Sequence, residues 1–382
     1  MNYSNLDQIL QHYTDRFEEL NNDVNQEYYK WEIAAQFRSK MDEALESDDQ
    51  LLPAKLASVV LLTSQTIDNR YELSFHALAD YARHEPNTVR SMLKELLLTD
   101  DNGDLSARMS RFVDFVNQCQ SLLEKYMPDS WRYRPSIRLP MMLTGYYDPD
   151  QYYLFKAQQV KDYAECVEFY DELGSGTSFH LINYYRLCDA LVDRIRQNER
   201  LIALNKTRYS LSNKPMHPDG NLHLLAFDVI YCSTVYHLFD GIHYTVKNAA
   251  ERKQYTENKR VAEQLASECA TALTEAAELD RAMAFFTSQL AAGNRLLHKT
   301  KGYGLISSFD EKAGKLSLEF DNGNTATLLW PACLLGGAIS FESSIPAEEY
   351  AQMIRKIKLA RGIRQNAKIA EQRLAPYEKF LK

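Results

Sequence analysis

The sequence predicts a mainly α-helical protein with a small α+β region and a small β-barrel near its C-terminus. Apolar residues recur at spacings of three and four in the first and last thirds, which is the period of amphipathic helices. Around residue 300 the period changes to two, with turn residues between short apolar runs, as in strands. We therefore divide the chain into a helical domain (1–127), an α+β region (128–245), a long coiled-coil-like helix (246–298), an SH3- or Tudor-like barrel (299–342) and a basic C-terminal helix (343–382).

Composition is that of a globular protein with room for several cores: 382 residues, 45% hydrophobic and 25% charged. No apolar run reaches the roughly eighteen residues of a membrane span, and the N-terminus lacks a signal-peptide pattern. The six cysteines are scattered without a C-x-x-C pair, which favours reduced thiols. We expect a cytoplasmic protein with no membrane contact, no metal and no cofactor.

Charge is distributed unevenly around the net value of −8. Residues 1–127 hold 12 Lys and Arg against 22 Asp and Glu, whereas residues 246–382 hold 20 against 16. A basic C-terminal third directs any nucleic-acid contact to that end of the chain. The alternative is a solvated surface of uneven charge.

The helical domain contains one very regular apolar stripe. Its members alternate spacings of four and three: Leu105, Met109, Phe112, Val116, Cys119, Leu123 and Tyr126. Such a stripe predicts one amphipathic helix packed on a core. An earlier helix is expected to begin at Pro86, since proline is tolerated in a first turn.

The α+β region opens on an aromatic-rich stretch that predicts a β-hairpin. Its strands are 136–146 and 151–155, joined by the turn Asp148-Pro149-Asp150. Core packing is one explanation of these aromatics. The other is an exposed stacking surface for nucleic acid, with Arg132 and Arg134 beside it.

The long helix carries a heptad-like seam, which predicts a coiled coil. The seam favours a homodimer, although another helix of the same chain is an alternative partner. The proposed dimerisation residues are Leu265, Ala272, Ala276, Leu279, Met283, Phe286 and Leu290, with Cys269 in the same stripe.

The barrel is predicted from three strands at 303–309, 315–320 and 325–330, with a fourth after Gly336-Gly337. Asn322-Gly323 between two of them is a strong hairpin signal. Three aromatic residues of these strands are candidate stacking residues for nucleic acid: Tyr303, Phe309 and Trp330.

The C-terminal helix is expected to be capped by Ser344, with Pro346 in its first turn. It holds six cations with no acid between them, and these are candidate phosphate contacts. A solvated helix that covers the barrel or binds an acidic protein is the alternative. The six are Arg355, Lys356, Lys358, Arg361, Arg364 and Lys368.

Six short segments between residues 27 and 238 carry a family resemblance: Tyr29-Lys30-Trp31-Glu32, 85–92, Asp104-Leu105, 152–156, 182–185 and 224–229. In this order they resemble the N-terminal region of bacterial McrB-type AAA+ proteins, the GTPases and ATPases of modification-dependent restriction and anti-phage defence. The AAA+ motor of that family is missing, because no G-x-x-x-x-G-K-[ST] loop occurs, so we expect no nucleotide hydrolysis.

The barrel segments 301–306, 318–321 and Trp330-Pro331 resemble the Tudor-like domains at the ends of UvrD-type helicases, which are adaptor modules. Together the resemblances imply a non-enzymatic recognition or adaptor subunit that binds nucleic acid, with DNA favoured, or a partner helicase, nuclease or AAA+ protein.

Two other functions stay open. One is a metal-dependent nuclease, for which Asp310-Glu311-Lys312 could form part of a metal site. Separately, Arg70 and His76 have the spacing of a HEPN ribonuclease motif. The other is a purely structural dimeric scaffold.

Overall fold

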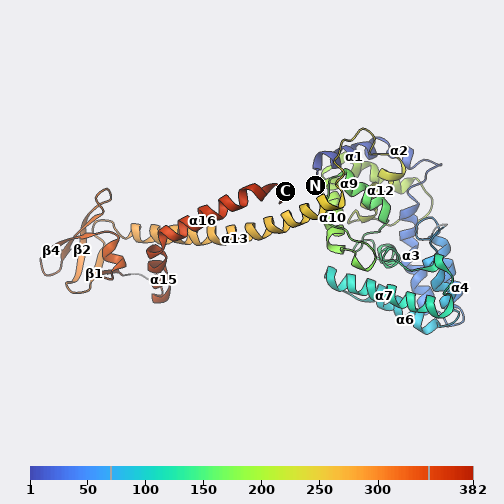
Figure 1. The fold of residues 1–382 in the computed structure, drawn as a ribbon, viewed down its shortest axis with the longest axis horizontal. Helices are drawn as coiled ribbons and strands as arrows, with labels where there is room; N and C mark the ends of the chain where they lie inside the picture. Colours follow the sequence, from blue (N-terminus) through green and yellow to red (C-terminus); the bar gives the residue numbers. More distant parts are fainter. Residues whose placement is uncertain (69–70, 343–344, 382) are drawn as a thin grey trace. The chain divides into compact units, whose positions relative to one another are not determined.

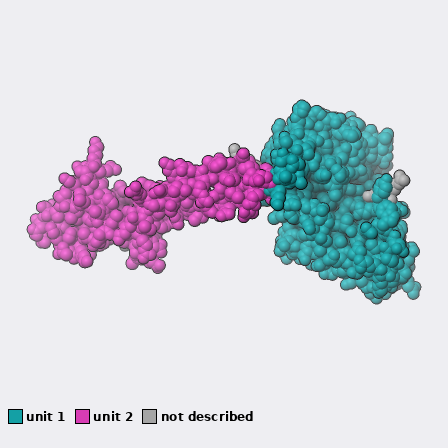
Figure 2. All heavy atoms as spheres, in the orientation of Figure 1, with its two compact units in different colours: residues 1–253 teal, residues 254–382 magenta. Residues whose placement is uncertain are grey.

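The computed structural model describes residues 1–68, 71–342 and 345–381 and contains two compact units (Figures 1 and 2). Unit 1 is Met1–Lys253 and unit 2 is Gln254–Lys382. Both are mostly helical, and the strands of the described residues all lie in unit 2, so the mainly α fold class with a small β part is confirmed. No helix in the described ranges combines the length and apolar character that a bilayer span needs.

The helices of unit 1 are α1 (Tyr3–Asp15), α2 (Phe17–Leu20), α3 (Tyr29–Glu46), α4 (Leu52–Leu62), α5 (Ser74–Tyr81), α6 (Pro86–Leu98), α7 (Leu105–Tyr126), α8 (Arg138–Tyr147), α9 (Ala157–Cys166), α10 (Leu181–Gln197), α11 (Glu199–Thr207) and α12 (His223–Val235), with 3-10 turns η1 (Trp131–Tyr133), η2 (Gly176–Ser178) and η3 (Arg208–Ser210). They share one hydrophobic core that includes residues from both 1–127 and 128–245. These two segments therefore form a single unit.

The predicted start of α6 and stripe of α7 are confirmed. Helix α6 begins at Pro86, and Asp104 caps α7 by accepting from the amides of Ser106 and Ala107 at 2.8 and 3.3 Å. The stripe is buried or half-buried along its length, with Phe112, Cys119 and Leu123 facing the core.

The predicted β-hairpin is wrong. Residues 138–147 form helix α8, and residues 152–155 are extended but pair with no strand of the described chain. All ten residues of α8 are buried. Burial on every side removes the amphipathic period that would have marked a helix, and Pro140 is tolerated because it lies in the first turn. The aromatics here pack the core.

The N-terminus is tied to the far end of unit 1. The amide N–H of Asn2 donates to the carbonyl of Val167 at 2.7 Å. The side-chain amide of Asn5 donates to the carbonyls of Cys166 at 2.8 Å and His243 at 3.1 Å. Helix α1 thus closes a core whose other parts come from residues up to 243.

Unit 2 is built from α13 (Ala249–Ser288, which begins in unit 1), β1 (Arg295–His298), β2 (Gly302–Asp310), β3 (Lys315–Phe320), β4 (Thr325–Leu329), α14 (Ala332–Leu335), β5 (Ile339–Phe341), α15 (Ala347–Lys358), α16 (Ala360–Leu374) and the 3-10 turn η4 (Ala375–Phe380). The strands form one antiparallel sheet in the order β4-β3-β2-β1-β5. Its side chains share a core with Leu279 and Phe286 of the long helix and with Leu290, which follows that helix.

All four predicted strands are present, as β2, β3, β4 and β5. The predicted helix 246–298, however, ends ten residues earlier than expected. It stops at Ser288, and residues 295–298 form β1, which the sequence analysis missed. Gly293, with φ of +91°, lies between them and takes a backbone conformation that other residues rarely adopt.

A bulge in β2 decides which side chains face the core. The register of β2 against β3 shifts between Ile306 and Ser308, so that Ile306 and Phe309, three residues apart, both face inward. At Gly304 a Cβ atom would meet Glu319 O at 2.9 Å, so only glycine allows β2 and β3 to approach this closely.

Candidate nucleic-acid interface

The six predicted phosphate-binding cations lie on two helices. The structure ends α15 at Lys358, places Leu359 between the helices, and begins α16 at Ala360, so the single basic helix of the prediction is corrected to two. The predicted cap of this segment, Ser344, lies outside the described residues.

Two of the six cations are bound to acids of α13. Lys356 pairs with Glu278, and the Arg364 guanidinium lies 3.1 Å from Asp280. A further pair joins Arg373 to Glu268 at 3.0 Å. Glu268 precedes Asp280 on α13, whereas their partners come in the reverse order on α16, with Arg364 before Arg373. The two helices therefore run antiparallel, as Figure 1 shows.

The other four cations are exposed: Arg355, Lys358, Arg361 and Lys368. None of them forms an ion pair within the described part of the chain. Arg361 and Lys368 lie three residues before and four after Arg364, so they share its flank of α16. The positive charge of α15 and α16 that no acid of the described chain neutralises is therefore carried by these four side chains.

The three predicted stacking residues do not form one platform. Phe309 and Trp330 pack edge to face, with ring centroids 6.3 Å apart, and both lie against the core of unit 2. Tyr303 precedes the β2 bulge and points outward, where Arg295 lies 4.9 Å from its ring centroid. Tyr303 is the exposed one of the three, and its ring is already covered by an arginine.

Arg132 and Arg134 belong to unit 1, where Arg132 lies within the turn η1 and Arg134 follows it directly. Arg134 is exposed and Arg132 is half-buried, and neither forms an ion pair in the described residues. They therefore belong to a separate site from the cations of α15 and α16.

The proposed dimerisation seam is largely covered by the chain itself. Four of its residues are buried: Leu265, Leu279, Phe286 and Leu290. Two are half-buried, Ala272 and Ala276, and the side chain of Met283 is 37% exposed. The latter half of α13 packs on the sheet and α15, and α16 is bound beside the earlier half. The intramolecular partner that the sequence left open is thus present, and the homodimer stays a prediction.

The most concentrated charge in unit 1 is a buried network. Lys30 donates to the carboxylates of Glu27 and Asp228, and the hydroxyl of Tyr13 donates to Asp228. Arg208 in turn donates to the Tyr13 oxygen at 2.9 Å. All five side chains are buried. Two segments that carry the McrB-type resemblance, 29–32 and 224–229, supply Lys30 and Asp228.

The same place offers the only cluster of possible metal ligands among the described residues. The ligand atoms of Glu27, Asp228 and Cys232 lie within 4.8 Å of one another. The ammonium of Lys30 already pairs with both carboxylates there, and a second cation, Arg208, lies 3.7 Å from Asp228. Burial raises the pKa of the Cys232 thiol well above its usual value, so the sulfur stays protonated. These residues fit a structural ion pair better than a metal site.

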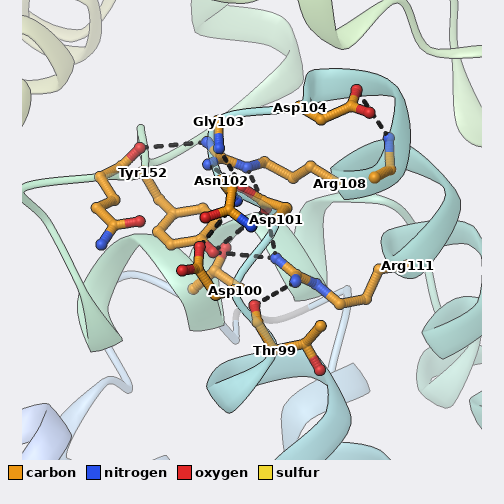
Figure 3. A network of polar contacts seen from close by, with 12 residues as sticks. Thr99, Asp100, Asp101, Asn102, Gly103, Asp104, Arg108, Arg111 and Tyr152 are labelled. Atoms are coloured by element: carbon orange, nitrogen blue, oxygen red, sulfur yellow. Dashed lines mark hydrogen bonds and ion pairs between the residues drawn. The ribbon is translucent and has the colours of Figure 1, made fainter.

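A second buried network holds the loop between α6 and α7 (Figure 3). The guanidinium of Arg108 donates two hydrogen bonds of 2.7 Å to the carboxylate of Asp101, and Arg111 donates to the same carboxylate at 2.8 Å. Arg108 also donates to the hydroxyl of Tyr185 at 2.8 Å. Three of these four hydrogen bonds go to the carboxylate of Asp101, so the network fixes the loop.

The candidate nuclease motifs do not assemble. Asp310 and Glu311 lie at the turn between β2 and β3, where the Asp310 carboxylate accepts from the amide of Ala313 at 3.0 Å. Arg70 lies outside the described residues. His76 lines a hollow of about 540 Å³ beside α4 and α5 that is mostly apolar, with Asp68 and Ser64 as its other polar residues. The Asp68 carboxylate is engaged by the amides of Phe75 and His76.

Comparison with known proteins gives no family: no family model, no curated protein and no solved structure matches this chain. The resemblances to McrB-type and UvrD-type proteins therefore stay predictions from the sequence.

Proposed function

We propose that this protein is a non-enzymatic, nucleic-acid-binding adaptor of a bacterial anti-phage defence or restriction system. One observation carries the binding part of the proposal: Arg355, Lys358, Arg361 and Lys368 are exposed on consecutive helices and have no acid partner in the described chain. Such side chains gain most from an external phosphate, because no internal ion pair has to be broken.

The ion pairs of the neighbouring cations support this assignment. Lys356 and Arg364 hold α15 and α16 against α13. The free cations are thereby presented from an ordered surface, so that less conformational entropy is lost when phosphate binds.

The sheet supports an adaptor role of the SH3- or Tudor-like kind. Its strands follow one another as a meander, a helical turn (α14) follows β4, and the short β5 returns to the opposite edge beside β1. We propose that this module contacts a partner motor or nuclease while the helices beside it contact DNA.

The test is a binding titration with a short labelled DNA duplex at two salt concentrations. The test variant changes four side chains to Gln: Arg355→Gln, Lys358→Gln, Arg361→Gln and Lys368→Gln. Its matched control changes four exposed lysines of unit 1 to Gln: Lys94, Lys161, Lys206 and Lys253.

Each lost phosphate contact should flatten the log–log salt dependence by about 0.9 units for duplex DNA. We expect a slope about 3 to 4 units shallower in the test variant, on the basis of that value, and little change in the control. Equal affinity and slope in wild type and test variant would remove these helices from the interface.

A further inference from the structure

Two large aromatic side chains of unit 1 are strongly exposed. Trp131 is 59% exposed and Tyr71 is 67% exposed. Trp131 differs in this from Trp31, which is fully buried, and from Trp330, which packs on the core of unit 2. Leaving so much aromatic surface in water is unfavourable, and exposed aromatics with arginine nearby are typical of binding surfaces.

The structure brings together the two segments that carry these aromatics, although 60 residues separate Tyr71 from Trp131 in the sequence. The amide of Leu73, two residues after Tyr71, donates to the carbonyl of Arg132 at 2.8 Å. The hydroxyl of Tyr133 donates to Asp80 of α5 at 2.7 Å and anchors η1 on that helix. Tyr133 thus holds the turn in place while Trp131 projects into solvent.

The charge of this surface, which we call the η1 surface (Tyr71, Trp131, Arg132 and Arg134), suits an anion. Arg132 and Arg134 have no ion-pair partner among the described residues, and the Nε atom of Arg132 is shielded from solvent without an acceptor.

Two of the acids nearby are already engaged. Glu72 lies 2.8 Å from Arg138 and accepts from Ser136, and Asp80 accepts from Tyr133 and pairs with Arg83. The two arginines of the η1 surface are therefore available to an outside anion.

We propose that the η1 surface binds single-stranded nucleic acid, with Trp131 and Tyr71 stacking on bases and Arg132 and Arg134 contacting phosphates. Stacking on aromatic side chains requires bases that are not paired in a duplex, so single strands fit this surface and duplexes do not. The proposal extends the proposed nucleic-acid binding to unit 1 and assigns it a different strand type. DNA and RNA single strands share this chemistry.

The test uses the full-length chain and three labelled probes: an oligothymidylate, an oligouridylate and an oligo(dA)·oligo(dT) duplex. The test variant combines Trp131→Ala with Tyr71→Ala, and its conservative partner combines Trp131→Phe with Tyr71→Phe. Tyr244→Ala, an exposed tyrosine elsewhere in unit 1, is the control. The four-Gln variant of α15 and α16 is titrated beside them.

We expect the alanine pair to weaken binding of both single strands by about 5- to 100-fold, the range that loss of base stacking produces, and to leave duplex binding unchanged. The phenylalanine pair should recover most of the loss, and Tyr244→Ala should lose nothing. Preference between the thymidylate and uridylate probes would identify DNA or RNA as the source of the strand.

The proposal is overturned if the alanine pair binds single strands as tightly as wild type, or loses duplex binding to the same extent. The four-Gln variant separates this outcome from the function proposed above. Duplex binding that is lost in the four-Gln variant alone supports the α15–α16 contact and leaves the η1 surface without a role. Wild type that binds none of the three probes overturns both proposals.

Discussion

Lys30 and Asp228 form an ion pair inside unit 1 although 198 positions separate them in the chain. Both side chains are completely shielded from solvent. Burial alone would lower the pKa of Lys30, but the combined attraction of Asp228 and the neighbouring Tyr29, Cys232 and Glu27 outweighs it, and the pKa lies well above its usual value. The lysine is therefore charged.

Asp228→Asn should destabilise unit 1 strongly, because it leaves a buried ammonium with one carboxylate fewer. We expect the free energy of unfolding to fall by about 3 to 5 kcal/mol, measured by urea denaturation. Glu43→Gln is the control, since it breaks the more exposed pair with Lys55 and should change the free energy of unfolding far less. Equal losses in the two variants would contradict the structural role of the buried pair.

Arg108→Lys should loosen the loop between α6 and α7. Lysine keeps the charge but cannot make the two-pronged contact with Asp101 or reach the Tyr185 hydroxyl at the same time. We expect a loss of about 1 to 3 kcal/mol in the free energy of unfolding, which is the cost of leaving a buried hydrogen-bonding group without a partner. Arg196→Lys, in an exposed pair with Asp193, is the matched control and should be neutral.

Asp219 should make unit 1 less stable as the pH rises. Burial raises its pKa to about 7, against the lowering effect of the amides of Leu224 and Leu225 that it accepts from. A pKa above the unfolded value of 3.8 means that the folded state holds its proton more tightly, so stability declines between pH 3.8 and about 7. Urea midpoints across this range should fall in wild type and stay flatter in Asp219→Asn. Parallel profiles would show that the carboxyl is ionised throughout.

The contact of α16 with α13 should depend on charge. Arg364→Glu with Arg373→Glu places like charges opposite Asp280 and Glu268. Because these pairs are exposed, we expect a small change in overall stability, below about 1 kcal/mol for each pair, but faster amide hydrogen exchange along α16. Adding Asp280→Arg and Glu268→Arg should restore slow exchange. Exchange that does not change in the first variant would show that apolar contacts alone hold α16.

The parts of the fold that alternate between buried and exposed residues could be predicted from the sequence. The stripe from Leu105 to Tyr126 identified α7, and Asn322-Gly323 located the turn between β3 and β4. Helix α8 could not be predicted in this way, because it is buried on all sides and its aromatic residues favour strands equally well.

The candidate interface was predictable in composition but not in detail. The six cations between 355 and 368 are evident in the sequence, whereas the acids that neutralise two of them, Glu278 and Asp280, lie about eighty positions earlier. The exposure of Tyr71 beside Trp131 depends on a contact between distant segments. Which of the six cations are paired with an acid and which are not can be read only from the folded structure.

The bonds of Asn5 to Cys166 and His243 have a consequence for how the protein is made. The ribosome delivers Asn5 first, and 238 further positions must be translated before the carbonyl of His243 exists. At about 5 to 20 residues per second this takes roughly 12 to 48 s. For most of that time Leu6, Ile9 and Leu10, which are buried in the finished unit, lack the contacts that α10, α11 and α12 provide. The nascent chain therefore exposes the apolar face of α1 until translation of the unit is nearly complete.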